Sequence, residues 1–163
     1  MKKLLLIAVG FIMSANFAFA QIPDVNIENG KGEIISTSSL IDGKTPMILV
    51  FWDITTKSSI VELNAISNHL DEWEDEVGNF RVVAVSIGDS RSVPKAKAMV
   101  SAFGWDDYIA LYDKNQEFKR GMNINAIPHV FVVDANGKIV YSKVGYIPGN
   151  EIELLKSLKK LKE

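Results

Sequence analysis

Residues 47–52, Met-Ile-Leu-Val-Phe-Trp, form an unbroken apolar run. Consecutive apolar residues rich in β-branched and aromatic side chains are typical of a strand that is buried on both faces. Strands of this kind occupy the middle of parallel or mixed sheets, where helices cover both sides. The run therefore predicts an interior strand of an α/β sandwich.

The next segments alternate between helical and extended patterns. From residue 58 to residue 77 apolar side chains recur at steps of three and four, which predicts one long helix that stops at Gly78-Asn79. A second interior strand is expected over 80–87 and a helix over 95–103, with Phe103 facing inward. Because a helix connects the two interior strands, they should run parallel with a right-handed crossover. The buried stripe of the long helix should comprise Ile60, Leu63, Ile66, Leu70, Trp73 and Val77, with Glu62 off that stripe.

The C-terminal half predicts a hairpin. Its arms are residues 129–133 and 139–144, and the Asn136-Gly137 pair between them favours a tight turn. A short strand is expected over 109–112 and a helical turn over 116–120.

The two ends of the domain carry weaker signals. Asn150-x-x-Glu153 has the spacing of a capping box, which predicts that a last helix begins there and covers 151–161. Residues 21–46 are rich in loops, and only 33–36 is expected to form a short edge strand.

The first twenty residues have the features of a secretory signal peptide. Lys2 and Lys3 precede an apolar stretch, and Ala18-Phe19-Ala20 is a small-x-small cleavage signal, so cleavage is expected between Ala20 and Gln21. The alternative is an uncleaved anchor, although the apolar run is short for a membrane span. Residues 1–20 are thus predicted to be the signal peptide and 21–163 one domain, exported most plausibly to the periplasm of a Gram-negative bacterium.

Composition excludes several classes of function. The formal net charge is −2 and no basic run is present, so nucleic acid is not an expected partner. The chain contains no cysteine, so no thiol chemistry and no disulfide are available to it. The two histidines are far apart in sequence and form a poor metal set. We expect no cofactor, no metal and no membrane span after cleavage.

Three local motifs follow one another in the predicted domain. The buried strand ends in Phe51-Trp52 before the long helix, Ile127-Pro128 directly precedes a strand, and residues 131–140 read Phe-Val-Val-Asp-Ala-Asn-Gly-Lys-Ile-Val, with Gly145 after the hairpin. In this order the motifs resemble the thioredoxin fold, and most closely the exported TlpA/ResA branch of thiol–disulfide oxidoreductases among the redoxin or AhpC/TSA-like proteins. The resemblance covers essentially the whole mature chain. It implies a three-layer α/β sandwich with a mixed β-sheet and helices on both faces, and a cis-proline at Pro128.

The central motif departs from this family. Where the family has Trp-Cys-x-x-Cys, the resemblance places Thr55 at the tryptophan and Thr56 and Ser59 at the two cysteines, with Ser58 at the usual proline. Disulfide exchange requires a thiolate, and a hydroxyl neither ionises as readily nor forms a reversible counterpart to the disulfide. The same absence excludes a peroxidatic cysteine and a copper site of the Sco type.

Several roles remain open for this turn. Hydroxyls at a helix start can cap backbone N–H groups, which is the favoured interpretation, with Ser59 or Thr56 as the cap. The alternatives are a pocket for an anion or a peptide, and a serine nucleophile, for which His129 would be the base in reach. His129 is otherwise expected to be a half-exposed residue at a strand start. The predicted binding residues are Trp52, Thr55, Thr56, Lys57, Ser58, Ser59, Ile127, Pro128 and His129.

The sequence therefore predicts an exported thioredoxin-like protein that has lost its redox centre. The favoured function is a non-catalytic binding or accessory module, whose partner is an extended peptide or an envelope protein held beside Thr56, Ile127 and Pro128. Such pairing uses the backbone and needs no cysteine. The competing hypotheses are a thiol–disulfide oxidoreductase, as family resemblance alone would suggest, and a structural subunit of an envelope complex.

Overall fold

The computed structural model describes residues 20–162. The predicted signal peptide lies outside the described residues except for Ala20. Within the described part of the chain, no helix combines the length and the apolar character that crossing a bilayer requires.

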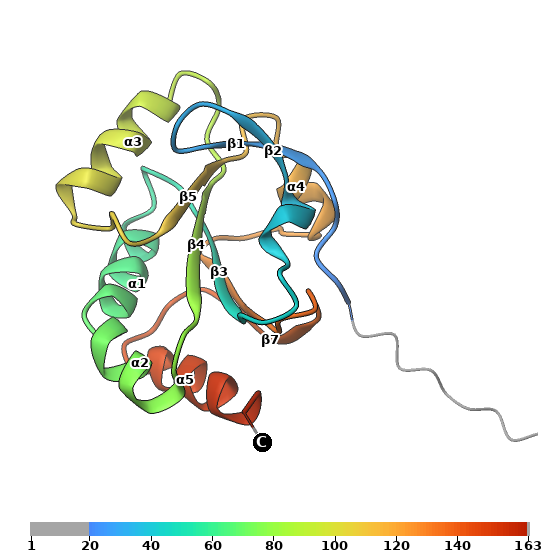
Figure 1. Ribbon diagram of the computed structural model, residues 1–163. Coiled ribbons are helices and arrows are strands. Elements are labelled where there is room, and N and C mark those ends of the chain that lie inside the picture. Colours follow the sequence, from blue (N-terminus) through green and yellow to red (C-terminus); the bar gives the residue numbers. More distant parts are fainter. Residues whose placement is uncertain (1–19, 163) are drawn as a thin grey trace, which may run out of the picture.

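One mixed sheet of seven strands forms the centre of the molecule, in the order β2-β1-β5-β4-β3-β6-β7 (Figure 1). Strand β3 is parallel to β4, which is parallel to β5, whereas β6 is antiparallel to both β3 and β7. The parallel pairing and the C-terminal hairpin confirm the sequence predictions. The strands are β1 (Asn26–Asn29), β2 (Ile34–Ser36), β3 (Met47–Trp52), β4 (Arg81–Ser86), β5 (Ile109–Tyr112), β6 (His129–Val133) and β7 (Ile139–Val144).

Helices cover both faces of this sheet. One face packs against four helices through a cluster that includes Trp52, Leu63, Trp73 and Leu154. The other face packs against α4 and the 3₁₀ helix η1 through a cluster that includes Phe51 and Phe118. The helices are η1 (Thr37–Leu40), α1 (Lys57–Ser67), α2 (Leu70–Val77), α3 (Val93–Ala102), α4 (Glu117–Gly121) and α5 (Asn150–Lys160).

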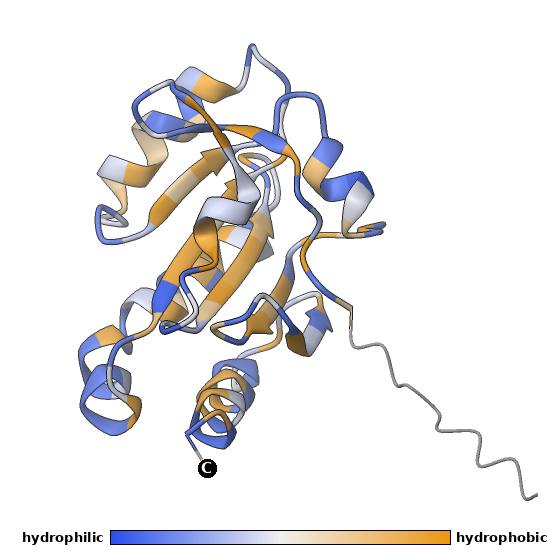
Figure 2. Cartoon of the chain, turned by 45° about the vertical axis from the view of Figure 1, so that its right-hand side comes forward, coloured by the Kyte–Doolittle hydropathy of each residue, from blue (hydrophilic) through white to orange (hydrophobic). Residues whose placement is uncertain are grey.

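All six residues of β3 are buried, as the apolar run predicts. Alternate side chains point to opposite faces of a strand, so β3 contributes Ile48, Val50 and Trp52 to one cluster and the residues between them to the other. The apolar colouring of the central strands is visible in Figure 2. The predicted α/β sandwich with a mixed sheet and two helical layers is confirmed.

The predicted long helix is in fact two helices. Helix α1 ends at Ser67, and α2 begins at Leu70 after a turn at Asn68 and His69. Ser, Asn and His are poor helix formers, because their side chains compete for backbone groups or lose rotamer freedom. The His69 ring stacks on Trp73 at 5.6 Å and contacts Glu72, which places this side chain at the new helix start. The apolar stripe nevertheless packs as predicted.

Four local predictions are wrong. Strand β1 was not expected, and it forms because the polar segment around Ile27 pairs with both β2 and β5. Phe103 is 43% exposed, since it lies just past the end of α3 and stacks on Trp105. The cap of α5 is Gly149, and no capping box forms there, since Glu153 pairs with Lys156. Glu62, expected to lie off the buried stripe, is 1% exposed.

Candidate functional site

The polar turn after β3 lies at the end of the sheet where ligands bind in many open α/β folds, beyond the carboxyl ends of the parallel strands. Three loops meet there, since β3, β4 and β5 all end on this side. The N–H of Ile87 donates to the Trp52 carbonyl at 3.0 Å, and the Asp113 N–H donates to Ser86 at 2.8 Å. These bonds fix the relative positions of the first residues of the three loops.

Asp53 shapes the turn between β3 and α1. Its Oδ1 atom accepts a hydrogen bond from the Thr55 N–H at 2.7 Å and another from the Thr55 hydroxyl. Its carbonyl accepts from the Thr56 N–H at 3.3 Å. An aspartate that bonds to the backbone two residues on is a recognised turn former, and this signal was overlooked in the sequence. The Thr55 hydroxyl therefore already has a hydrogen-bond partner in Asp53.

The hydroxyls at the start of α1 do not cap the helix. Thr56 is the N-cap residue, but no side-chain bond accompanies it. Ser59 is fully buried, and its Oγ atom has no partner among the described residues. The backbone N–H groups of Lys57 and Ser58 also lack an acceptor within residues 20–162. The capping interpretation is wrong, and this helix start keeps free donors beside the exposed Lys57 side chain.

Ile127 and Pro128 lie beside this turn. The Ile127–Pro128 peptide bond is cis, as the resemblance implies. Phe51 faces His129 in the ladder between β3 and β6, so the residues before His129 adjoin the end of β3. Ile127 is half-buried, and neither its N–H nor its carbonyl has a partner in the described chain. Pro128 is buried, and its carbonyl accepts from the Gly145 N–H at 2.7 Å.

His129 does not face the turn. Its ring stacks on Phe131 at 4.2 Å, and Phe131 belongs to the cluster on the α4 side of the sheet. Helix α1, which carries Ser59, packs on the opposite side. Nε2 contacts the Ser142 Oγ at 2.8 Å, and burial lowers the pKa of the imidazole. The half-exposed interpretation is wrong, since His129 is 9% exposed, and no serine–histidine pair exists with Ser59.

Glu62 is a buried carboxyl group that the sequence prediction missed. It lies one turn beyond Ser59, and its Oε2 atom has no partner among residues 20–162. Burial, with a smaller contribution from the charge of Glu151, raises the pKa of Glu62 to about 8. Glu62 is therefore an uncharged acid at neutral pH. Its side chain lies near Glu151 at the start of α5.

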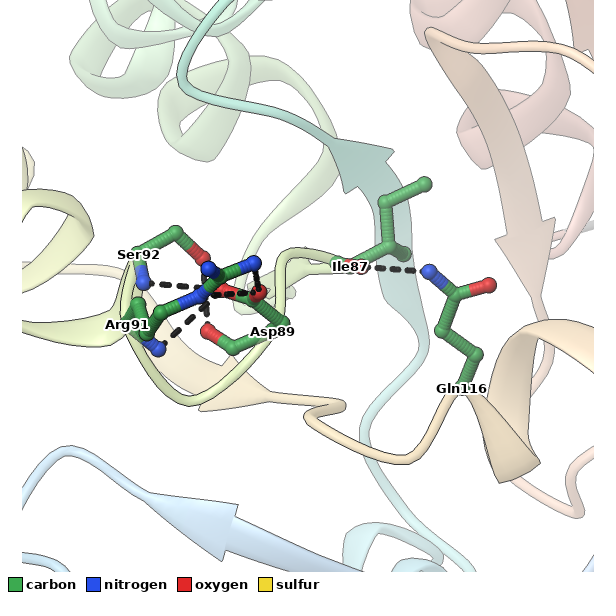
Figure 3. A network of polar contacts seen from close by, with 5 residues as sticks. All are labelled: Ile87, Asp89, Arg91, Ser92 and Gln116. Atoms are coloured by element: carbon green, nitrogen blue, oxygen red, sulfur yellow. Dashed lines mark hydrogen bonds and ion pairs between the residues drawn. The ribbon is translucent and has the colours of Figure 1, made fainter.

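A second group of missed residues fixes the neighbouring loops (Figure 3). The Nε2 atom of Gln116 donates to the Ile87 carbonyl at 3.1 Å, which ties the start of α4 to the end of β4. Asp89 accepts from the Arg91 guanidinium at 2.7 Å and from the backbone N–H groups of Arg91 and Ser92. These loops have no helical or strand period, so their contacts cannot be predicted from periodicity.

The nine predicted binding residues gather at one end of the sheet but differ in access. Trp52, Ser59, Pro128 and His129 are buried. The accessible members are Thr55, Thr56, Lys57, Ser58 and Ile127. Within the described residues no three acidic or histidine side chains are grouped as a metal site would require.

Comparison with known proteins identifies the family. The model of the AhpC/TSA family matches residues 19–142, which is most of the chain. This chain belongs to the AhpC/TSA family. No curated protein matches it.

Solved structures support the thioredoxin-like fold of this family member. A thioredoxin-like protein from Porphyromonas gingivalis is 41% identical with a TM-score of 0.76, over 88% of this chain and 92% of the other. A protein described as the thiol:disulfide interchange protein DsbE of Chlorobium tepidum is 19% identical with a TM-score of 0.74, over 89% and 97%. An exposed lipoprotein thioredoxin of Streptococcus pneumoniae is 22% identical with a TM-score of 0.62, over 85% and 100%. The last two show similarity of fold only.

The site of this family member has no sulfur nucleophile, because the chain has no cysteine. What the turn offers are free backbone N–H groups at a helix start, accessible hydroxyls and one ammonium group. Such groups bind carboxylates and backbone carbonyls by hydrogen bonding.

Proposed function

We propose that this protein is an exported, thiol-free relative of the TlpA/ResA branch that binds an extended segment of a partner protein. The segment lies between the turn of residues 55–58 and Ile127. The observation that carries the proposal is the free backbone of Ile127, whose N–H and carbonyl both lack partners within residues 20–162. A half-buried, unpaired backbone edge can pair with an extended peptide as an added strand does.

Export is the second part of the proposal. Its support is the predicted leader of residues 1–20. Cell fractionation and N-terminal sequencing test this part. We expect the processed chain in the periplasmic fraction with Gln21 as its first residue. A full-length chain retained in the membrane fraction would contradict cleavage.

The absence of thiol chemistry is tested with insulin reduction by dithiothreitol. The protein should not accelerate the reaction above the uncatalysed rate. Dithiol-dependent turnover in a preparation free of contaminating thioredoxin would revive the oxidoreductase hypothesis, which rests on family membership.

Peptide binding is tested by selection from a library of short random peptides displayed on phage. A selected peptide should shift the amide resonances of Lys57, Ser58 and Ile127 in the NMR spectrum of the protein. Methylating the paired backbone nitrogen of the peptide should weaken binding about tenfold, because one backbone hydrogen bond is lost in a partly dry site. If no peptide is selected, or the shifts occur elsewhere, the proposed function is wrong.

A matched pair of variants localises the binding. Ser58→Asp places a carboxylate in the first turn of α1, where it favours the helix yet opposes a peptide carbonyl or carboxylate. Ser90→Asp introduces the same change at an exposed position of the loop after β4. We expect S58D to weaken binding and S90D to leave it unchanged.

A further inference from the structure

A cavity lies away from the turn of residues 55–58, on the α3 side of the sheet. It has a volume of about 380 Å³ and is bounded by the turn after β1, by α3 and by β5. The residues that matter for its chemistry are Lys31, Lys97, Val100, Asp106, Ala110 and Tyr112. None of the predicted binding residues is part of it.

Tyr112 gives the cavity a hydroxyl without a protein partner. The residue is 3% exposed, and its hydroxyl makes no hydrogen bond with any described residue. Burial and the nearby negative charge of Glu28 raise the pKa of this phenol, so it remains a hydrogen-bond donor. A hydroxyl that lines an open cavity and has no protein partner is free to bond to a ligand in that cavity.

Two lysines, Lys31 and Lys97, line the same cavity. The Nζ atom of Lys97 lies 5.1 Å from the centre of the Tyr112 ring and donates to Glu28 at 2.9 Å. Glu28 is also paired with Lys114 at 2.5 Å, so its single negative charge faces two positive charges. The Lys31 ammonium has no partner within residues 20–162. The cavity therefore has a surplus of positive charge, in a chain whose formal net charge is −2.

The edge of β5 adds backbone groups. Strand β1 pairs with Tyr112 and Leu111 and then turns away, so it does not cover the first half of β5. The Asp113 N–H donates to β4, and since backbone direction alternates along a strand, the groups of Ala110 point away from β4 toward the cavity. Gly30 lies next to the Ala110 carbonyl. Val100 and Ile109 provide an apolar wall beside this strand edge.

We propose that this cavity binds a carboxylate carried on a short apolar chain. The carboxylate lies between the Tyr112 hydroxyl and the ammonium groups of Lys31 and Lys97, and the apolar chain packs on Val100 and Ile109. Asp106, which is exposed, is the one carboxylate side chain that lines the cavity, and it opposes an anionic ligand. The carboxylate can belong to a free aliphatic acid or to the C-terminus of a peptide, since both present the same group.

The test uses hexanoate as the probe, with hexan-1-ol as the uncharged probe of equal chain length. Titration into the purified protein should produce saturable shifts of the Lys97 and Ala110 amide resonances with hexanoate and not with hexanol. N-acetyl-alanyl-leucine, which has a C-terminal carboxylate, distinguishes the two sources of the ligand by its affinity relative to hexanoate. Absence of saturable shifts with both carboxylates, or equal shifts with hexanol, overturns the proposal.

Variants should change the affinity for hexanoate in opposite directions, which nonspecific binding does not do. Tyr112→Phe and Lys31→Gln should each weaken binding about fivefold, because each removes one donor to the carboxylate. Asp106→Asn should strengthen binding about twofold, because it removes a like charge. Lys44→Gln, at an exposed position before β3, is the control and should change nothing. Unchanged affinity in both Y112F and K31Q contradicts the assignment, and normal melting curves confirm that the variants are folded.

Discussion

Ser59 and Glu62 lie one helical turn apart on α1, and both are buried with a side-chain oxygen that no described residue pairs with. Residues three apart on a helix share a face, so the hydroxyl and the carboxyl face the same interior region between α1 and α5. Unsatisfied buried polar groups destabilise a fold, by about 1–3 kcal/mol each for neutral groups. The two unpaired oxygens therefore reduce the stability of the first half of α1.

Replacing Glu62 by Gln should remove a pH-dependent loss of stability. The pKa of Glu62 is about 8 in the folded chain against 4.5 for an ordinary glutamate, so the folded state holds a proton that the unfolded state releases. Stability from this group is complete below about pH 4.5 and is lost as the pH rises to about 8, in total about 5 kcal/mol. Guanidinium unfolding of both proteins at about pH 5 and about pH 9 measures the difference.

The control is Glu74→Gln, an exposed glutamate on α2. Its free energy of unfolding should follow the wild-type pH dependence. If E62Q and wild type lose equal stability between the two pH values, Glu62 has no raised pKa in the folded chain and the prediction is wrong.

The double variant Thr56→Cys, Ser59→Cys should form an intramolecular disulfide on air oxidation. The two positions are the N-cap and the third residue of α1, joined by the 3.0 Å bond from the Ser59 N–H to the Thr56 carbonyl. Such closeness is compatible with disulfide geometry, and a helix N-terminus favours the thiolate that attacks. Mass spectrometry after alkylation counts the free thiols. The single variants T56C and S59C supply the reference, and two alkylated thiols in the oxidised double variant would show that the turn is misplaced on the family motif.

His129 should make the fold sensitive to acid. Burial lowers its pKa below the ordinary 6.5, so between those two values the unfolded state binds a proton that the folded state does not. Stability from this histidine is present above about pH 6.5 and is lost as the pH falls toward the lower folded pKa. His129→Gln should reduce that loss. His69→Gln, whose ring is 41% exposed, should not, and equal acid sensitivity of the three proteins would count against a buried neutral imidazole.

Much of this fold follows from periodicity. The apolar run of β3 could be assigned from sequence because each of its residues is buried, whichever way its side chain points. Strand β1 could not, since its polar residues gain their strand conformation from pairing with β2 and β5, which is a tertiary effect.

The site was harder to predict for a related reason. The position of the turn follows from the order of strand and helix, but the direction of each side chain does not. Alternate residues of β6 point to opposite faces of the sheet, so His129 shares a face with Phe131. That face packs against α4, and His129 therefore points away from the turn. Glu62 is polar and was expected to be exposed, and its burial is a tertiary effect that the helical period does not reveal.

Comparing glycine variants of Gln116 and Asn123 measures how much the side-chain bond between α4 and β4 contributes to stability. Both are non-glycine residues with positive φ, at 55° and 52°, so replacing either by Gly relieves a similar backbone cost. Of the two, only Gln116 makes side-chain bonds to described residues: its Nε2 donates to the Ile87 carbonyl at 3.1 Å, and its Oε1 accepts from the Lys119 ammonium at 3.3 Å. Q116G should therefore be about 1 kcal/mol less stable than N123G in chemical denaturation. Equal stability of the two variants would mean that the Gln116 bond adds nothing to the fold and that the loop after β4 is held by its own Asp89 contacts.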